Sequence, residues 1–259
     1  MDFFYYALIS LFGLLIGSFV NAWEWRTRMR KPIVIARSEC THCGKGILWH
    51  DNIPIFSYLF LRGKCRHCQE SISIQYPIVE AMSLVLHFIS AWIHLGSGWT
   101  ASSAWLVTRD SLAIVVLLFV FVYDLKYREI EPKIVLGFAT VFALMNLFIF
   151  HKSILSIMIG MVVAGGFFGL QYVVSRGRWI GGGDIWLGVM MGALLGWPAS
   201  LVALFIAYVG DAVVSLIMML ARRQKLLDET PFGTYLAVAT LVTVWFGQGI
   251  IQWYMGMMK

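Results

Sequence analysis

Residues 3–23 read FFYYALISLFGLLIGSFVNAW, a run of 21 residues without a charged side chain. A helix of about 20 apolar residues spans the roughly 30 Å hydrocarbon core of a bilayer. The run lacks the basic residues that precede the apolar part of a cleavable secretory signal, so we expect a retained first span. This stretch alone predicts a membrane protein.

The composition of the whole chain supports a membrane protein. Hydrophobic residues make up 59% of the 259 residues and charged residues only 13%, with a mean hydropathy of +0.77. So few charged side chains cannot cover a soluble domain of this size. We expect an all-α polytopic membrane protein with about eight transmembrane helices, over Phe3–Trp23, Pro77–Leu95, Ala104–Tyr123, Ile134–Phe150, Ile154–Ser175, Ile185–Trp197, Pro198–Leu220 and Phe232–Met257. The sixth is short and rich in glycine, which predicts a tilted or broken helix whose freed backbone groups are satisfied inside the protein.

The basic residues predict the orientation. Seventeen of the 20 Lys and Arg fall in four loops, Glu24–Tyr76, Asp124–Lys133, Arg176–Gly183 and Ala221–Thr230. Short loops rich in Lys and Arg stay in the cytoplasm, so we expect these four loops inside the cell and both termini outside. We expect no nucleic-acid binding, because the basic residues are spread over separate loops without a compact basic motif.

All four cysteines lie in the first of these loops, as Cys40-x-x-Cys43 and Cys65-x-x-Cys68. Two such pairs predict a tetrahedral zinc site with four cysteine ligands, which holds a loop folded and leaves no open position for chemistry. Free thiols or two disulfides are the alternatives, although disulfides do not persist in a reducing compartment. His42 and His67 lie inside the pairs and are able to replace a thiolate, but we expect them outside the ligand set.

The predicted domains follow from these spans and from the cysteine loop. The first transmembrane helix covers residues 1–23, a cytoplasmic zinc-binding loop module covers residues 24–76, and a seven-helix membrane core covers residues 77–259. The small module is thus expected between the first and second helices.

Two acidic residues stand at the ends of predicted spans. Asp124 follows the charge-free run Ser111–Tyr123, and Asp184 follows Gly181-Gly182-Gly183. Ionisable groups at the edge of the hydrocarbon are costly, and the topology puts both acids at the same depth. Two carboxyls that share a proton activate water, one as general base and the other as general acid. We expect the two acids within reach of one water molecule, with the glycines allowing an extended peptide to lie against the backbone.

Each acid also has a simpler interpretation. Asp184 can complement the dipole of the helix that it begins, and Asp124 can pair with Lys126 or Arg128 in a solvated loop. Residue type and position do not decide between these interpretations and a paired-acid site. Asp211 is a third acid, expected in mid-membrane, and we assign it no catalytic role.

Several stretches together resemble the type IV prepilin leader peptidases of bacteria, which are membrane aspartic proteases of the Gly-x-Gly-Asp kind. Gly181-Gly182-Gly183-Asp184 resembles that motif. Asp124 followed by Ile130 resembles the first aspartate motif, here with Glu131 inserted before Pro132, and Trp186 stands in a region where a lysine is frequent in the family. The other matching stretches are GSFVN at 17–21, CTHC at 40–43, NIPIFSY at 52–58, LRGKCRHC at 61–68 and YPIVE at 76–80.

The resemblance implies a peptidase of the bacterial inner membrane with its active site facing the cytoplasm. Its substrates would be prepilins or the pseudopilins of type II secretion, cut after a glycine that ends a short basic leader. Asp124 and Asp184 would be catalytic and Gly181–Gly183 would bind substrate. Many members then methylate the new amino terminus with S-adenosylmethionine, for which Gly63 and Lys64 are the candidate residues. The expected partners are these substrates and the lipid bilayer.

Two other functional classes compete with this one. A proton-coupled transporter would line a path with Asp124, Asp184 and Asp211, and its mark would be paired inverted repeats, of which the sequence shows none. A non-enzymatic scaffold of a pilus or secretion machine would use the zinc loop as a docking face. Uptake by proteoliposomes and cleavage of a purified prepilin distinguish the three.

Overall fold

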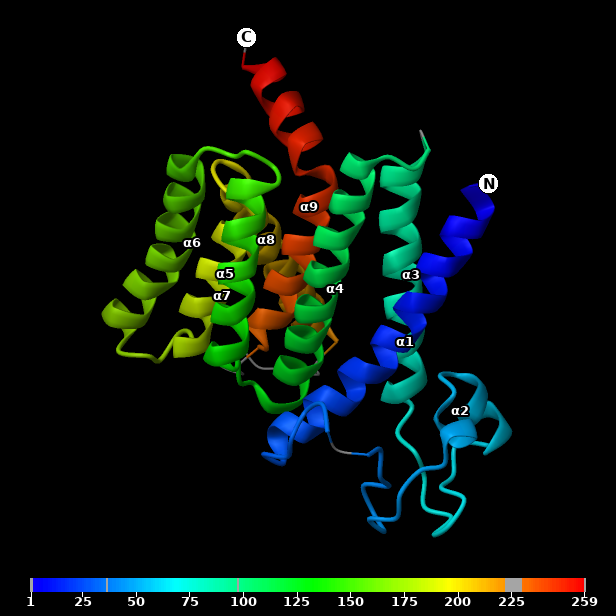
Figure 1. Cartoon of the computed structure of the whole chain (residues 1–259). Coiled ribbons are helices and arrows are strands. Elements are labelled where there is room, and N and C mark those ends of the chain that lie inside the picture. The colour runs from blue at the N-terminus through cyan, green and yellow to red at the C-terminus, as the bar shows by residue number, and fades with distance from the viewer. Residues whose placement is uncertain (1, 36, 97, 222–229, 259) are drawn as a thin grey trace. The chain divides into compact units, whose positions relative to one another are not determined.

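The computed structural model describes residues 2–35, 37–96, 98–221 and 230–258, which form helices joined by loops (Figure 1). The elements in chain order are α1 (Asp2–Arg28), the 3-10 helix η1 (Trp49–Asn52), α2 (Phe56–Phe60), α3 (Gln75–Leu95), α4 (Ala101–Tyr127), α5 (Pro132–Phe148), α6 (Ile154–Ser175), α7 (Gly182–Leu195), α8 (Ala199–Leu220) and α9 (Phe232–Met257). Among the described residues there are two isolated β-bridges and no strand. The predicted all-α class is confirmed.

Each predicted span corresponds to a helix, but two of these helices are short. Six helices are long and apolar enough to cross a membrane: Phe3–Arg28, Gln75–Leu95, Ala101–Tyr127, Ile154–Ser175, Ala199–Leu220 and Phe232–Met257. The fourth and sixth predicted spans correspond to α5 and α7, which have 17 and 14 residues. At 1.5 Å per residue these two are about 25 and 21 Å long, less than the hydrocarbon core. The protein is therefore multi-pass, with six candidate spans where eight were expected. Most of the predicted basic loop Ala221–Thr230 lies outside the described residues.

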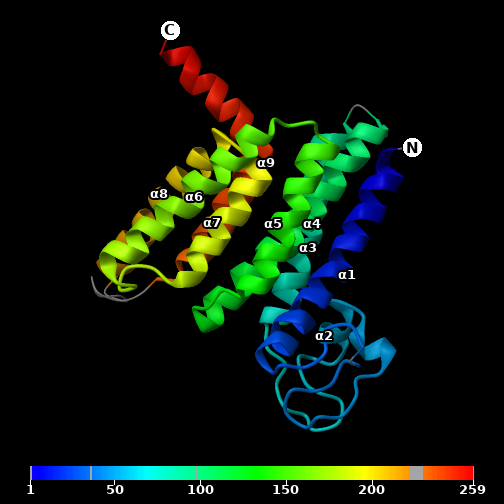
Figure 2. The ribbon, with the colours of Figure 1, turned by 60° about the vertical axis from the view of Figure 1, so that its left-hand side comes forward.

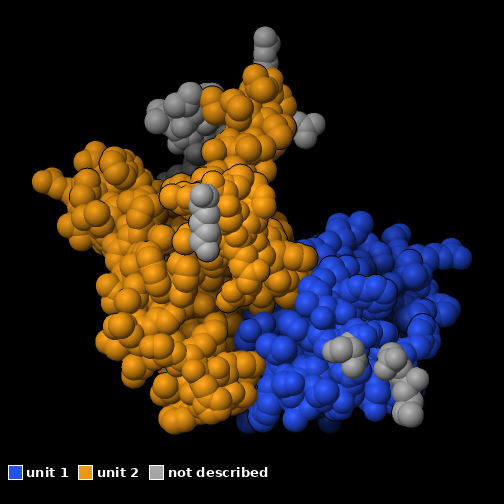
Figure 3. All heavy atoms as spheres, turned by 90° about the horizontal axis from the view of Figure 1, so that it is seen from above, with its two compact units in different colours: residues 1–119 blue, residues 120–259 orange. Residues whose placement is uncertain are grey.

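The chain forms two compact units, Met1–Phe119 and Val120–Lys259, which are coloured separately in Figure 3. The division falls within α4, so the last turns of that helix belong to the second unit. Asp124 and Asp184 are therefore both in the second unit, and the four cysteines are all in the first.

In the first unit, α1 packs along α3, as Figure 2 shows. Two glycines one turn apart on α1 allow the close approach. A Cβ added at Gly13 would lie 2.7 Å from the Cβ of His87, and one added at Gly17 would lie 2.6 Å from the Cα of Glu80. Ser83 donates a hydrogen bond to the Gly13 carbonyl at 2.6 Å. Small residues and interhelical hydrogen bonds of this kind hold membrane helices together.

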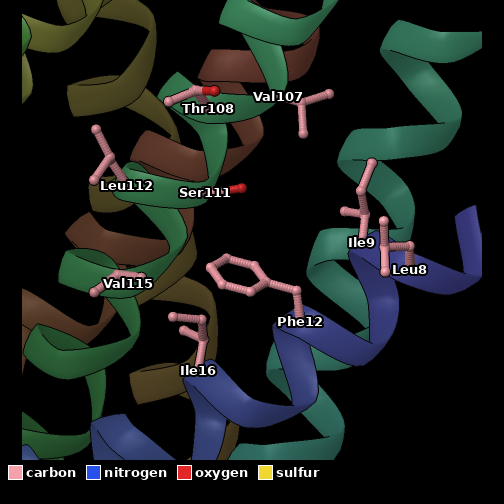
Figure 4. A pocket seen from close by; sticks show the side chains of 9 residues that line it. All are labelled: Leu8, Ile9, Phe12, Ile16, Val107, Thr108, Ser111, Leu112 and Val115. Atoms are coloured by element: carbon pink, nitrogen blue, oxygen red, sulfur yellow. The ribbon is translucent and has the colours of Figure 1, made fainter. Parts of the chain in front are cut away.

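A cavity of about 560 Å³ lies between α1 and residues 107–115 of α4 (Figure 4). Its lining is apolar apart from the hydroxyls of Thr108 and Ser111, and Phe12 points across it toward α4. Thr108 donates its hydroxyl to the carbonyl of Ala104 in its own helix, at 2.8 Å. Such a lining suits contact with apolar groups such as lipid chains.

In the second unit, α7 is the central helix. Nine of its 14 residues are buried, and small residues face each other where it crosses α6. A Cβ added at Gly192 would lie 2.3 Å from the backbone of Gly160, and one added at Gly188 would lie 2.9 Å from the carbonyl of Ala164. A helix surrounded by protein does not need the full length of a lipid-facing span.

The last carbonyls of α7 are satisfied by side chains from the α5–α6 region. Asn146 donates to the carbonyls of Ala193 and Leu194 at 2.6 and 2.9 Å, and Lys152 donates to that of Leu195 at 3.2 Å. These bonds confirm the expectation that backbone groups freed at this short helix find partners inside the protein.

Candidate active site and metal centre

Asp124 lies three residues before the end of α4 and is 5% exposed. Its Oδ2 accepts hydrogen bonds from the backbone N–H of Thr234 at 2.9 Å and from the Thr234 hydroxyl at 3.1 Å. Thr234 is the third residue of α9, so Asp124 accepts from the amino terminus of that helix, where the Thr234 N–H also donates to the Pro231 carbonyl at 3.1 Å. A buried carboxylate in this position is not part of a solvated loop, although Arg128 interacts with it electrostatically, as the simpler interpretation allowed.

Asp184 is the third residue of α7 and is 7% exposed. Its Oδ2 accepts a hydrogen bond from the backbone N–H of Gly181 at 3.0 Å, and its own N–H donates to the Gly181 carbonyl at 3.2 Å. Asp184 therefore caps the helix that it begins, as the simpler interpretation predicted. This local role does not exclude a second one, because the cap uses only one of the two carboxylate oxygens.

Both acids line one cavity of about 470 Å³. The rest of the described lining consists of Arg128–Pro132, Gly177–Gly183, Thr230 and Phe232. The two carboxylates interact electrostatically, and the bonds from Thr234 and Gly181 both reach Oδ2 of their acid. The structure thus brings Asp124, Asp184 and the three glycines of the predicted substrate loop together around a single space.

Ile130 fills the gap between the helix starts beside this cavity. A Cβ added at Gly183 would lie 2.7 Å from the Cβ of Ile130, and one added at Gly233 would lie 3.1 Å from its Cδ1. The inserted Glu131 is the residue before α5, Pro132 is the first residue of that helix, and Tyr123 donates its hydroxyl to Glu131 at 3.4 Å. Glu131 is therefore accommodated at the start of α5.

Sequence reasoning missed Gly233 and Thr234. A Cβ added at Gly233 would lie 2.9 Å from Oδ2 of Asp124, so the backbone of α9 approaches the acid closely. The available signal was the stretch PFGT at 231–234, because the first N–H groups of a membrane helix require acceptors. Asp211 does not line the cavity; Ser215, one turn on in α8, donates to it at 3.4 Å.

The four cysteines form one cluster in the first unit. The sulfur atoms of Cys40, Cys43, Cys65 and Cys68 all lie within 4.8 Å of one another, and Cys40 and Cys68 are 3.9 Å apart. A tetrahedron of thiolates about 2.3 Å from zinc has edges of about 3.8 Å. The donor set therefore fits a structural zinc ion. None of the four is in a disulfide, and neither His42 nor His67 belongs to the cluster among the residues described.

The two cysteine pairs have the same backbone path. The N–H of Cys40 donates to the carbonyl of Lys45 and the N–H of Gly44 to that of Cys40, each at 2.9 Å. In the second pair the N–H of Cys65 donates to Glu70 at 2.9 Å and that of Gln69 to Cys65 at 3.0 Å. Gly44 and Gln69 occupy the same position in the turn and both have positive φ, 69° and 60°. We refer to residues 40–45 and 65–70 as the two knuckles.

The second knuckle favours a thiolate. Hydrogen bonds from the backbone N–H groups of Cys68 and His67 lower the pKa of the Cys65 thiol to about 6. The backbone N–H of Glu70 also lowers the pKa of Cys68, but desolvation and the neighbouring thiols outweigh it and raise that pKa to about 12. Within this knuckle Cys65 therefore loses its proton before Cys68, and a divalent cation would supply the charge needed to remove the proton of Cys68.

Gly63 and Lys64 lie between α2 and the second knuckle. Gly63 has φ of +67°, and a Cβ added there would lie 3.0 Å from the hydroxyl oxygen of Tyr58. Its N–H donates to the Tyr58 carbonyl at 2.9 Å and its carbonyl accepts from Ile72 at 2.7 Å. Lys64 is exposed and forms a β-bridge with Ser71. The positive φ of this turn and its closeness to Tyr58 therefore account for the glycine at position 63.

Two family models match the chain. Residues 11–94 match the bacterial peptidase A24 N-terminal domain, and residues 111–216 match the type IV leader peptidase family. The cysteine cluster lies in the first match and both aspartates lie in the second. Gly233 and Thr234 lie outside both. No solved structure matches the chain.

Curated relatives are similar along nearly the whole chain. The prepilin leader peptidase/N-methyltransferase of Aeromonas hydrophila is 29% identical over 97% of this chain and 94% of its own length. The protein of the same name from Legionella pneumophila is 27% identical over 98% and 95%, and that from Myxococcus xanthus is 33% identical over 82% and 63%. With its paired aspartates and cysteine cluster inside the two matched regions, the chain belongs to the type IV leader peptidase family.

Proposed function

We propose that this protein is an aspartic endopeptidase of the bacterial inner membrane that removes the leader from prepilins or type II secretion pseudopilins. The observation that carries the proposal is the single cavity lined by Asp124 and Asp184, each held through its Oδ2 atom. The names of the relatives support the substrate class. The test is cleavage of a purified prepilin by the reconstituted protein, with the cut site read by mass spectrometry.

We further propose that all eight long helices cross the membrane, including α5 and α7. Pro132 at the start of α5 and Asp184 at the start of α7 both line the cavity, whereas Asn146 near the end of α5 binds the last turn of α7. Between them α6 runs back, because Ser156 near its start contacts Trp197 and Gly177 after its end lines the cavity. Three consecutive helices thus cover the same thickness, and one of them, α6, is itself a candidate span.

With this proposed topology the cavity would face the cytoplasm. Eight crossings put the basic loops around Asp124 and Asp184 on the same side as the cysteine module, the arrangement favoured by short loops rich in Lys and Arg. On the same grounds we retain the division into a first helix (1–23), a module (24–76) and a membrane core (77–259). The zinc ion would be held by the four cysteines and would stabilise the module without entering the reaction.

In the proposed reaction, one carboxylate takes a proton from a water molecule between the two acids while the other donates its proton to the peptide carbonyl. The water oxygen bonds to the carbonyl carbon, the C–N bond then breaks, and the amine leaves with a proton from the pair while a hydroxyl of the intermediate returns a proton to it. In Asp184 the hydrogen bond from Gly181 reaches Oδ2, so its Oδ1 is the oxygen that we assign to these transfers. Gly181–Gly183 leave room for an extended peptide beside them.

Replacing Gly233 with Ala tests how Asp124 is positioned. The new Cβ would press on Oδ2 of Asp124 at 2.9 Å, so the carboxylate has to move. A misplacement of about 1 Å costs roughly 100-fold in rate, and we expect kcat for prepilin cleavage to fall by about that factor. Gly249→Ala on the same helix meets nothing within 4 Å and is the control. Equal kcat in the two variants would contradict the assignment.

Replacing Thr234 with Val tests the side-chain hydrogen bond to Asp124. The variant keeps the backbone N–H and loses the hydroxyl, which donates to Oδ2 at 3.1 Å. A hydrogen bond to a charged group is worth about 1.5 kcal/mol or more, so we expect a fall in kcat of about tenfold. Thr234→Ser restores the donor and should recover most of the rate. If Ser and Val are equally slow, shape rather than the hydroxyl positions the acid.

We propose N-methylation of the new amino terminus as a second activity, on the ground that the relatives carry both names. S-adenosylmethionine would supply the methyl group, and Gly63 and Lys64 are the candidate residues nearby. Because Gly63 already has a structural reason, Lys64→Ala is the more informative variant. It should leave the cut intact and remove the methyl group from the mature pilin, as read by mass spectrometry. A fully methylated product would exclude Lys64.

A further inference from the structure

A short segment of the cysteine module exposes large apolar side chains. Within residues 49–60 these are Trp49 (81% exposed), Ile53 (43%), Phe56 (56%), Leu59 (65%) and Phe60 (84%). They belong to η1, α2 and the turn between them, and Ser57 of α2 ties the two helices together by donating to the carbonyl of His50 at 3.0 Å. Apolar side chains gathered in this way mark a surface that contacts an apolar partner.

This segment is held beside a membrane helix. The backbone N–H of Ile55, one residue before α2, donates to Oε2 of Glu80 at 2.7 Å. Glu80 is the sixth residue of α3, a candidate membrane span, and is therefore about 7.5 Å along it from its start. Ile55 is therefore level with the second turn of α3 and does not lie beyond the end of that helix. Figures 1 and 2 both show α2 beside the lower end of α3, with the remaining loops of the module extending beyond that end.

The neighbouring face of α3 is itself apolar and uncovered. Ile78 is 49% exposed, and Ile74, just before the helix, is 64% exposed. Basic residues follow α2 directly: Arg62 and Lys64 are both exposed. The whole loop 24–76 has nine Lys and Arg against four Asp and Glu. Positive charge beside aromatic and aliphatic side chains is the combination that binds the surface of an anionic bilayer.

We propose that η1 and α2 form an interfacial anchor, which lies in the headgroup region of the adjacent leaflet with Trp49 and Phe60 at the boundary of the acyl chains. We take lipid as the partner of this surface for two reasons. The segment adjoins the exposed apolar side chains at the start of α3, and the bond from Ile55 to Glu80 holds it level with the first turns of that span. Aromatic side chains are enriched at this level of the bilayer. The anchor fixes the height of the cysteine module against the membrane.

The test is a photo-crosslink to lipid. The full-length protein with p-benzoylphenylalanine in place of Phe60 is reconstituted into nanodiscs of phosphatidylethanolamine and phosphatidylglycerol, and a variant with the same group in place of the exposed Lys45 on the first knuckle is the control. Zinc content verifies that each module is folded. We expect a several-fold excess of lipid adducts at position 60. Equal yields at the two positions, or adducts at position 60 that shift to an added prepilin, would overturn the proposal.

A second variant tests the same anchor without a crosslinker. In Leu59→Ser/Phe60→Ser, hydrogen exchange in the same nanodiscs should show faster deuterium uptake over residues 56–60, because the segment loses its apolar contact. Uptake over the second knuckle, residues 65–70, should stay as in the parent protein. Unchanged uptake over residues 56–60 would show that these side chains do not hold the segment at the bilayer.

Discussion

Asp124→Asn and Asp184→Asn are each expected to lower the rate of prepilin cleavage by about 1000-fold or more, the scale of losing a general acid or base. An asparagine has nearly the same shape, and its carbonyl oxygen still accepts the hydrogen bonds now made by Thr234 and Gly181. The helices should therefore keep their arrangement. The measurement is kcat on a purified prepilin, with thermal unfolding in detergent as the check on folding.

Asp211→Asn is the matched control for these two variants. Asp211 is also an acid in a helix of the second unit, but it does not line the cavity and its hydrogen-bond partner is Ser215. We expect this variant to cleave at a rate within about twofold of the parent, because the substituted carboxylate is not at the site. Near-normal cleavage by either Asp124→Asn or Asp184→Asn would remove that carboxylate from the reaction.

Cys65→Ser is expected to reduce bound zinc from one ion per chain to nearly none. Structural zinc sites contribute on the order of 10 kcal/mol to the folding of small domains, so a module without its metal should unfold locally. We expect rapid proteolysis within residues 40–70 while the membrane helices persist. Zinc is measured by mass spectrometry of the purified protein, and cleavage of the loop by limited trypsin digestion.

His67→Ala provides the comparison within the same knuckle. The cluster consists of the four cysteines alone, so this variant should keep its zinc and its resistance to trypsin. Loss of zinc from His67→Ala with retention in Cys65→Ser would mean that the ligand set is mixed. If both variants keep one zinc ion per chain, the metal is bound by other residues.

The sequence was sufficient to predict that Asp124 and Asp184 lie at one site and that the four cysteines form one cluster, for two different reasons. The cysteine spacing is local, and four sulfurs within 4.8 Å follow from two turns of the same shape. The two acids are 60 residues apart, but the alternation of spans and basic loops already put them at one depth. The order of spans and loops was therefore enough to predict that two acids far apart in the sequence lie close together.

The residues that hold the acids were beyond such reasoning. Thr234 is 110 residues from Asp124, and nothing in a pattern of apolar runs indicates which helix start packs against which acid. Helix ends were also missed. The predicted sixth span ran to Trp197, whereas α7 ends at Leu195, because Gly196 takes φ of 71° and ends the helix within an apolar stretch. A hydropathy profile does not reveal a helix end that falls within an apolar stretch.

The hydrogen bonds between Asp124 and the start of α9 carry a consequence for biogenesis. Ribosomes deliver helices in order, so Asp124 enters the bilayer more than 100 residues before the amide that steadies it. Until α9 has inserted, a nascent chain holds an unsupported acid and an open site. A newly made chain should therefore have no peptidase activity until α9 has inserted.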